Sequence, residues 1–80
     1  MKVQDLICYL DLNPKYEWVE MEFFGRRVLD WAFLGKEGAM DFLHGIEPQR
    51  HESMSFHIVG TKDGDVLRVD VVEKKNNVTQ

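Results

Sequence analysis

The sequence predicts an α+β fold of order α-β-β-α-β-β, in which a four-stranded antiparallel sheet carries one main helix on one face and a short second helix. Two observations predict it. Residues 3–12 carry a helical period, and two later regions each alternate apolar and polar residues on both sides of a glycine-containing turn. Strands joined by short turns pair in antiparallel fashion, so one sheet covered by the first helix is the simplest closure.

The chain of 80 residues is long enough for one small domain. We expect a single α+β domain at residues 1–75 and a flexible polar tail at residues 76–80. Both halves read as a helix followed by a hairpin, but their residues do not match. The sequence therefore gives no sign of an internal repeat.

The first helix is expected at residues 3–12, VQDLICYLDL. Its apolar residues recur at helical spacing and define one buried face: Val3, Leu6, Ile7 and Leu10. Asp5 in the first turn interacts favourably with the positive end of the helix dipole. Pro14 ends the helix, because the residue before a proline is driven away from the α-helical conformation.

Residues 16–34 predict the first hairpin, with its turn at Gly25 and Arg26. The first strand has an apolar side that we assign to the core: Val19, Met21 and Phe23. The second strand has an aromatic side that we also assign to the core: Leu29, Trp31 and Phe33. This assignment leaves Trp18 on the outer face together with three acidic residues: Glu20, Glu22 and Asp30.

In the second half, residues 37–45 are expected to form the short helix and to end it at Gly45. Residues 46–53 are polar, contain a proline and show no period, so they predict an exposed loop. Strands are expected at residues 54–59 and 66–73, joined by a turn at Asp63 and Gly64. The last strand should point three residues inward, namely Leu67, Val69 and Val71, and its alternate residues outward, including Arg68 and Asp70.

Composition disfavours several classes of function. A net charge of −4 disfavours a nucleic-acid-binding protein, which normally presents a basic face. No apolar run approaches the roughly 20 residues that span a bilayer, and acidic residues near the N-terminus disfavour a signal peptide. The single cysteine, Cys8, leaves no internal disulfide. We therefore expect a cytoplasmic protein that contacts neither nucleic acid nor a membrane directly.

The sequence contains no recognisable catalytic or metal-binding motif. The spacings of His44, His51 and His57 match no ligand set, even when Cys8 or Asp41 is added. Cys8 lies on the polar side of the expected helix, with no oxyanion-hole motif nearby. We therefore expect no enzymatic activity, no metal and no cofactor.

The outer face of the sheet is the candidate site. Five residues are assigned to it: Trp18, Glu20, Glu22, Asp30 and Asp70. Carboxylates on a surface steer it toward a basic partner, and exposed tryptophan is enriched at interaction hot spots. The alternative is an ordinary solvated face whose charges prevent aggregation. For Trp18, the alternative is that the first helix or the tail covers it, or that a bulge turns it inward.

The opening residues, MKVQDLICYLDLNPKYEWVEM, resemble those of small bacteriophage and prophage accessory proteins. Such proteins begin with a Lys-Val-x-Asp-Leu-Ile-x-x-Leu helix, a proline-containing turn and a strand. The residues that match this pattern are Lys2, Val3, Asp5, Leu6, Ile7, Leu10, Pro14 and Val19. The resemblance implies a phage-type accessory protein and transfers no functional residue.

Together these features predict a small non-enzymatic module that binds a host protein with a basic surface. In its narrowest form it is a phage-encoded inhibitor or modulator that occludes a nucleic-acid-binding surface, similar to an anti-CRISPR protein. Two features motivate this prediction: the small size without catalytic chemistry, and a sheet face that combines Trp18 with carboxylates. The alternative is a structural or self-associating domain, in which Trp18 and the hairpin edge are buried in a homodimer.

Overall fold

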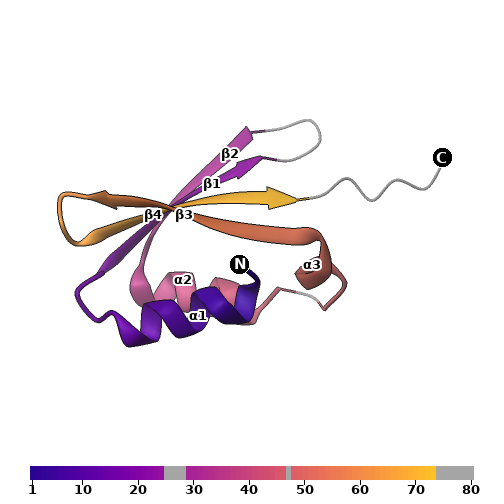
Figure 1. Cartoon of the computed structure of the whole chain (residues 1–80), viewed down its shortest axis with the longest axis horizontal. Helices are drawn as coiled ribbons and strands as arrows, with labels where there is room; N and C mark the ends of the chain where they lie inside the picture. The colour runs from indigo at the N-terminus through magenta and orange to yellow at the C-terminus, as the bar shows by residue number, and fades with distance from the viewer. Residues whose placement is uncertain (25–28, 47, 74–80) are drawn as a thin grey trace.

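The computed structural model describes residues 1–24, 29–46 and 48–73. The α+β class is confirmed (Figure 1). The elements are α1 (Val3–Leu12), β1 (Trp18–Phe24), β2 (Leu29–Gly35), α2 (Lys36–His44), α3 (Pro48–Ser53), β3 (Met54–Lys62) and β4 (Val66–Glu73). The expected turn at Gly25 and Arg26 and the expected tail at residues 76–80 lie outside the described residues.

The four strands form one mixed sheet in the order β2-β1-β4-β3. Both hairpins are antiparallel, but the central strands β1 and β4 are parallel, so the prediction of a fully antiparallel sheet was wrong. The segment with α2 and α3 carries the chain from one edge strand, β2, to the other, β3. β4 then returns beside β1 and runs in the same direction. The connection from β2 to β3 decides that β1 and β4 pair in parallel. The alternation of apolar and polar residues within a strand does not encode this connection.

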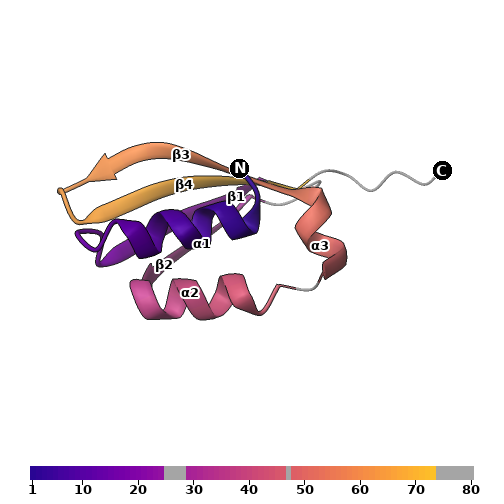
Figure 2. The same ribbon diagram turned by 60° about the horizontal axis from the view of Figure 1, so that its bottom comes forward.

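The helices α1 and α2 cover one face of the sheet, and within the described chain no helix covers the other (Figure 1, Figure 2). At the start of α1, Asp5 accepts a hydrogen bond of 3.2 Å from the backbone N–H of Lys2. At its end, the side-chain amide of Asn13 donates to the carbonyl oxygen of Tyr9 at 2.7 Å. These contacts satisfy backbone groups that every helix end leaves unpaired.

The hydrophobic core lies between this helix layer and the sheet. The predicted face of α1 is buried and confirmed: Val3, Leu6, Ile7 and Leu10. The sheet contributes further residues that the alternation predicted correctly: Val19, Met21, Leu67, Val69 and Val71. Phe56 of β3 and Leu43 of α2 are fully buried in the same core. Burying each such large side chain contributes about 1.5–3 kcal/mol relative to leaving it exposed.

Two local predictions in the second half were wrong. Residues 46–53 are not all loop, because α3 begins at Pro48. Proline is well tolerated at the first position of a helix, where its missing N–H costs no helical hydrogen bond and its φ is already helical. β3 extends to Lys62 instead of ending at residue 59, and its pairing with β4 shifts register between Ile58 and Gly60.

The turn between β3 and β4 was predicted correctly. Three residues, 63–65, separate the paired Lys62 and Val66, and two of them, Asp63 and Gly64, have positive φ angles of 58° and 85°. Aspartate and glycine adopt positive φ more readily than most residues. The following residue anchors the start of β1, because the carbonyl oxygen of Asp65 accepts backbone hydrogen bonds from Glu17 and Trp18 at 2.9 Å and 3.1 Å. This anchor fixes where Trp18 enters the sheet.

The register of the first hairpin places the aromatic residues of β2 on the face opposite to the predicted one. Trp31 opposes Glu22, and Phe33 opposes Glu20. Directly opposed residues of an antiparallel pair point to the same face of the sheet. Because the neighbouring Met21 is buried under the helices, both rings and both carboxylates lie on the uncovered face.

The assignment of Trp31 and Phe33 to the core was therefore wrong, and so was the placing of Asp30 on the outer face. Asp30 opposes Phe23, which packs against the core. The reason lies in hairpin geometry. Residues 25–28 separate the two strands, and an even number of connecting residues puts even-numbered residues of β1 opposite odd-numbered residues of β2. The sequence pattern indicated that one side of β2 is apolar, but it did not indicate on which face of the sheet that side lies. The structure does not describe the side chain of Leu29, the third residue that was assigned to the core side of this strand.

Candidate functional site: the open sheet face

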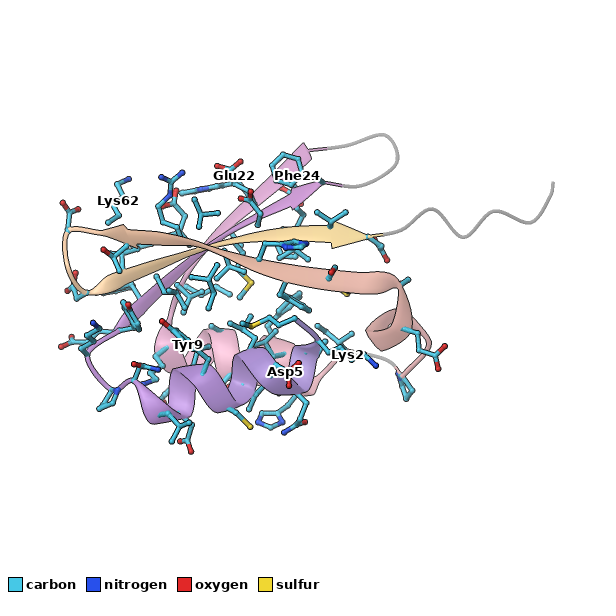
Figure 3. All side chains as sticks on the ribbon, viewed as in Figure 1. Lys2, Asp5, Tyr9, Glu22, Phe24 and Lys62 are labelled. Atoms are coloured by element: carbon cyan, nitrogen blue, oxygen red, sulfur yellow. The ribbon has the colours of Figure 1, made fainter. Side chains whose placement is uncertain are left out.

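We call the sheet face opposite α1 and α2 the open face. Figure 3 shows Glu22, Phe24 and Lys62 on this side, pointing away from the helices. The register of the inner strands and β2 adds further members: Trp18, Glu20, Trp31, Phe33, Arg68, Asp70 and Val72. Five of its large apolar side chains are exposed: Trp18, Phe24, Trp31, Phe33 and Val72. The open face is thus more apolar than the sequence predicted.

Three aromatic rings on this face form a stack, which we call the aromatic ladder: Trp18, Phe33 and Trp31. The ring centroids of Trp18 and Phe33 are 5.3 Å apart, with 13° between the ring planes. Those of Phe33 and Trp31 are 6.2 Å apart, with an angle of 16°. The side chains remain 41%, 42% and 55% exposed in the order given. Aromatic pairs at such separations attract one another, so the ladder is ordered although it is exposed.

The backbone of the hairpin explains why the ladder forms. The N–H of Lys36 donates to the carbonyl oxygen of Glu17 at 2.9 Å, so the next pair, Trp18 and Gly35, is a non-hydrogen-bonded pair, in which side chains are closest. Gly35 has no side chain, and a Cβ built there would meet Trp18 Cζ3 at 3.9 Å. The indole of Trp18 therefore lies beside this space and reaches diagonally to Phe33.

Glu20 is buried beside the ladder although the surrounding face is exposed. Only 8% of the residue is exposed, and it is the one buried charged residue of the described chain. Its Oε2 accepts a hydrogen bond of 2.8 Å from Nε1 of Trp31. Its Oε1 is buried and accepts no hydrogen bond from the described residues. Buried polar atoms are normally hydrogen-bonded, so Oε1 is an exception. It is an unused acceptor inside the open face.

Arg68 partly neutralises this carboxylate without bonding to it. It lies next to Glu20 in the parallel pairing of β1 and β4. Its Nε is 3.7 Å from Glu20 Oε1, and its Nη2 is 4.0 Å from Glu22 Oε1. Both distances exceed those of a hydrogen bond, and the arginine side chain is 43% exposed. Ion pairs of this kind contribute only about 0–1 kcal/mol.

Four of the five predicted site residues are brought together on the open face: Trp18, Glu20, Glu22 and Asp70. Trp18 is exposed, which excludes the alternative that the first helix covers it. Asp70 lies beside Glu22 and opposite His57 of β3. Asp30 is not part of the cluster: its Oδ1 accepts a hydrogen bond of 2.8 Å from the backbone N–H of Trp31.

The sequence reasoning missed Trp31 and Phe33 as members of the site. Their aromatic character favoured a core assignment, which the pairing with Glu22 and Glu20 overrides. A usable signal was present in the sequence. In a hairpin with an even number of turn residues, the odd positions of β2 must share a face with the glutamates of β1.

The described residues contain no group of three His, Cys, Asp or Glu side chains placed to hold a metal ion. Cys8 is exposed on α1, and His44 is the last residue of α2. The side chain of His51 lies outside the described side chains. Within the described ranges, no helix is both long and apolar enough to cross a membrane.

No protein-family model, curated protein or solved structure matches this chain. The residues of the open face combine an exposed aromatic ladder, a buried carboxylate with an unused acceptor, and an arginine held by long contacts.

Proposed function

We propose that this chain is a non-enzymatic protein-binding module that docks on its partner through the open face. The observation that carries the proposal is the aromatic ladder, whose three side chains are each at least 41% exposed on the sheet face that no helix of the described residues covers. Large exposed apolar patches mark interaction sites, and tryptophan is enriched among the residues that dominate binding energy. A partner that covers the ladder removes this apolar surface from water.

The charges on the open face favour a protein over a nucleic acid. Aromatic residues on a sheet also bind single-stranded nucleic acids by stacking with bases. Such sites combine the rings with a positively charged groove. Here the ladder lies beside Glu20 and Glu22, with Asp70 next to them, and Arg68 compensates only part of that charge. Phosphate groups would be repelled from this surface.

A narrower form of the proposal is a phage-encoded inhibitor or modulator, similar to an anti-CRISPR protein, that covers a basic surface of a host protein. The opening residues support the phage origin through their resemblance to phage accessory proteins. The carboxylates of the open face support a basic partner, because complementary charge speeds association and disfavours wrong partners. In this arrangement the ladder provides buried apolar area, and Glu20 and Glu22 select for positive charge.

The alternative is a homodimer in which two open faces meet. β2 is an edge strand and carries two of the three rings of the ladder. A two-fold axis places the same patch of both copies in contact, so one apolar patch is enough to form such an interface. Sedimentation of the wild-type protein separates the two proposals, since a monomer at high concentration excludes the homodimer.

The proposed function is tested by removing two of the three rings of the ladder without changing a core residue. The double variant Trp31→Ser, Phe33→Ser is compared with Leu12→Ser, which changes an exposed apolar residue at the end of α1. Each protein is immobilised and exposed to a bacterial lysate. We expect proteins that bind the wild type to be retained by Leu12→Ser and lost by the double variant. Equal retention by the double variant contradicts the proposal.

A further inference from the structure

The carboxylate of Glu20 is held in a fixed position, and one of its oxygens accepts no hydrogen bond from the described residues. The side chain is only 10% exposed, so it is nine-tenths buried. Trp31 Nε1 donates to Oε2 at 2.8 Å and thereby orients the whole carboxylate. Oε1 accepts no hydrogen bond from the described residues. Burial of such an atom is unfavourable until a donor reaches it, so the open face contains a built-in position for a donor.

Negative charge exceeds positive charge around this position. Glu22 follows on the same side of β1, and Asp70 lies beside it on β4. Among the described residues, Arg68 is the cation within ion-pair distance of Glu20 and Glu22, at 3.7 Å and 4.0 Å. One guanidinium therefore faces two carboxylates and is hydrogen-bonded to neither. A second cation would be attracted to this cluster.

We propose that the open face recognises an arginine side chain of a partner protein, whose guanidinium donates to Glu20 Oε1 and packs against the aromatic ladder. This inference rests on the proposed protein-binding function and adds the chemistry of the partner. Arg68 moves aside when the partner's arginine enters. Its 43% exposure and its long contacts to both glutamates make this displacement low in energy.

The surroundings of Glu20 favour arginine over lysine and exclude anions. Guanidinium is planar, carries five N–H donors, stacks on aromatic rings and is more weakly hydrated than ammonium. The indole of Trp31 is bonded to the same carboxylate and thus offers an aromatic surface next to the acceptor. Phosphate or carboxylate ligands would meet Glu20, Glu22 and Asp70 and be repelled.

The probe is the peptide acetyl-Gly-Arg-Gly-amide. Its control is the same peptide with citrulline in place of arginine, which has a similar shape but no charge. Both are titrated into ¹⁵N-labelled protein, and the indole N–H signal of Trp31 reports binding. We expect a saturable shift with the arginine peptide and about tenfold weaker binding of the citrulline peptide, because hydrogen bonds to charged groups are the stronger ones. Equal binding of the two peptides overturns the inference.

Two variants test the roles of the protein's own charges. Glu20→Gln keeps an acceptor for Trp31 and removes the charge, so the arginine peptide should bind about tenfold more weakly. Arg68→Met keeps the aliphatic stem and removes the competing cation, so the same peptide should bind about two- to fivefold more tightly. Glu37→Gln on the exposed start of α2 is the control and should bind like the wild type.

The outcomes separate this inference from the proposed function. Unchanged affinity in Glu20→Gln, or weaker binding in Arg68→Met, overturns the recognition of arginine. If Glu20→Gln fails to fold, the peptide comparison on the wild type and the Arg68→Met result still decide. In one outcome, the Trp31→Ser, Phe33→Ser variant loses the partner proteins but the wild type prefers neither peptide. This outcome overturns the recognition of arginine and supports the protein-binding function. Partner proteins that this variant retains refute the open face itself.

Discussion

The indole Nε1 of Trp31 donates a hydrogen bond of 2.8 Å to Oε2 of Glu20, and thereby joins the most exposed ring of the aromatic ladder to the buried carboxylate of the sheet. The bond crosses from edge strand β2 to inner strand β1. An exposed ring held in this way loses little conformational freedom when a partner covers it, and such preorganisation strengthens binding.

Substitution of Glu20 should separate its hydrogen bond from its charge. We expect Glu20→Ala to lower the free energy of unfolding by about 1–2 kcal/mol, because the bond to Trp31 and the packing of the side chain are lost. Glu20→Gln keeps an acceptor for Trp31 and should cost less than about 1 kcal/mol, because the ion pair that it removes is long, at 3.7 Å, and its arginine is 43% exposed. Urea unfolding measures both. An equal loss in the two variants contradicts the role of the hydrogen bond.

Substitution of one phenylalanine on each face tests the register of the first hairpin. Phe33 is 42% exposed on the open face, whereas Phe56 is fully buried under the helices. We expect Phe33→Ala to cost about 1 kcal/mol or less and Phe56→Ala about 3–5 kcal/mol. Thermal or urea unfolding gives both values. Comparable losses would mean that Phe33 belongs to the core, as its hydrophobicity alone suggests.

The fold was predictable where local patterns decide the structure. The period of α1 identified Val3, Leu6 and Leu10 as core residues, and the Asp63 and Gly64 turn identified the second hairpin. These features depend only on neighbours in sequence. The parallel pairing of β1 with β4 depends on where the crossover through α2 and α3 delivers β3, which no local period encodes.

The candidate site was predictable only in part. Glu20 and Glu22 were placed correctly because they alternate with core residues of their own strand. Trp31 and Phe33 were misplaced because apolar character was taken as evidence of burial. Under the proposed function, this inference fails on the open face because its apolar residues contact a partner and not the core.

Alkaline pH should weaken the fold through Tyr9. A hydrogen bond with the side chain of Tyr16, together with burial, raises the pKa of Tyr9 above its ordinary value of 10.0. The neutral phenol is thus favoured in the folded protein. The resulting stability is fully present below pH 10.0 and is lost as the pH rises through the raised pKa.

The variant Tyr9→Phe removes this titration and leaves Tyr16 in place. We expect the free energy of unfolding of the wild type to fall more steeply above pH 10.0 than that of the variant. Urea unfolding at a series of pH values measures the two slopes. Parallel slopes would show that the pKa of Tyr9 is the same in the folded and unfolded chains.

The two edges of the sheet are protected in different ways. On β3, the backbone N–H of Phe56 donates to the carbonyl oxygen of Met1 at 2.8 Å, and its carbonyl oxygen accepts from the Met1 ammonium at 2.7 Å. On β2, the N–H of Trp31 points away from β1 and is bonded to the carboxylate of Asp30 at 2.8 Å. Asp30 thus occupies a donor that an added strand would need.

Removal of the Asp30 carboxylate should expose this edge to other copies of the chain. We expect Asp30→Ala to self-associate at lower concentration than the wild type, because the Trp31 N–H becomes available for strand pairing beside an exposed aromatic ladder. Asp30→Asn also lacks the charge but keeps an acceptor, and should remain as soluble as the wild type. Light scattering over a concentration series compares the three proteins. If both variants associate alike, the lost charge is the cause, and the hydrogen bond does not protect the edge.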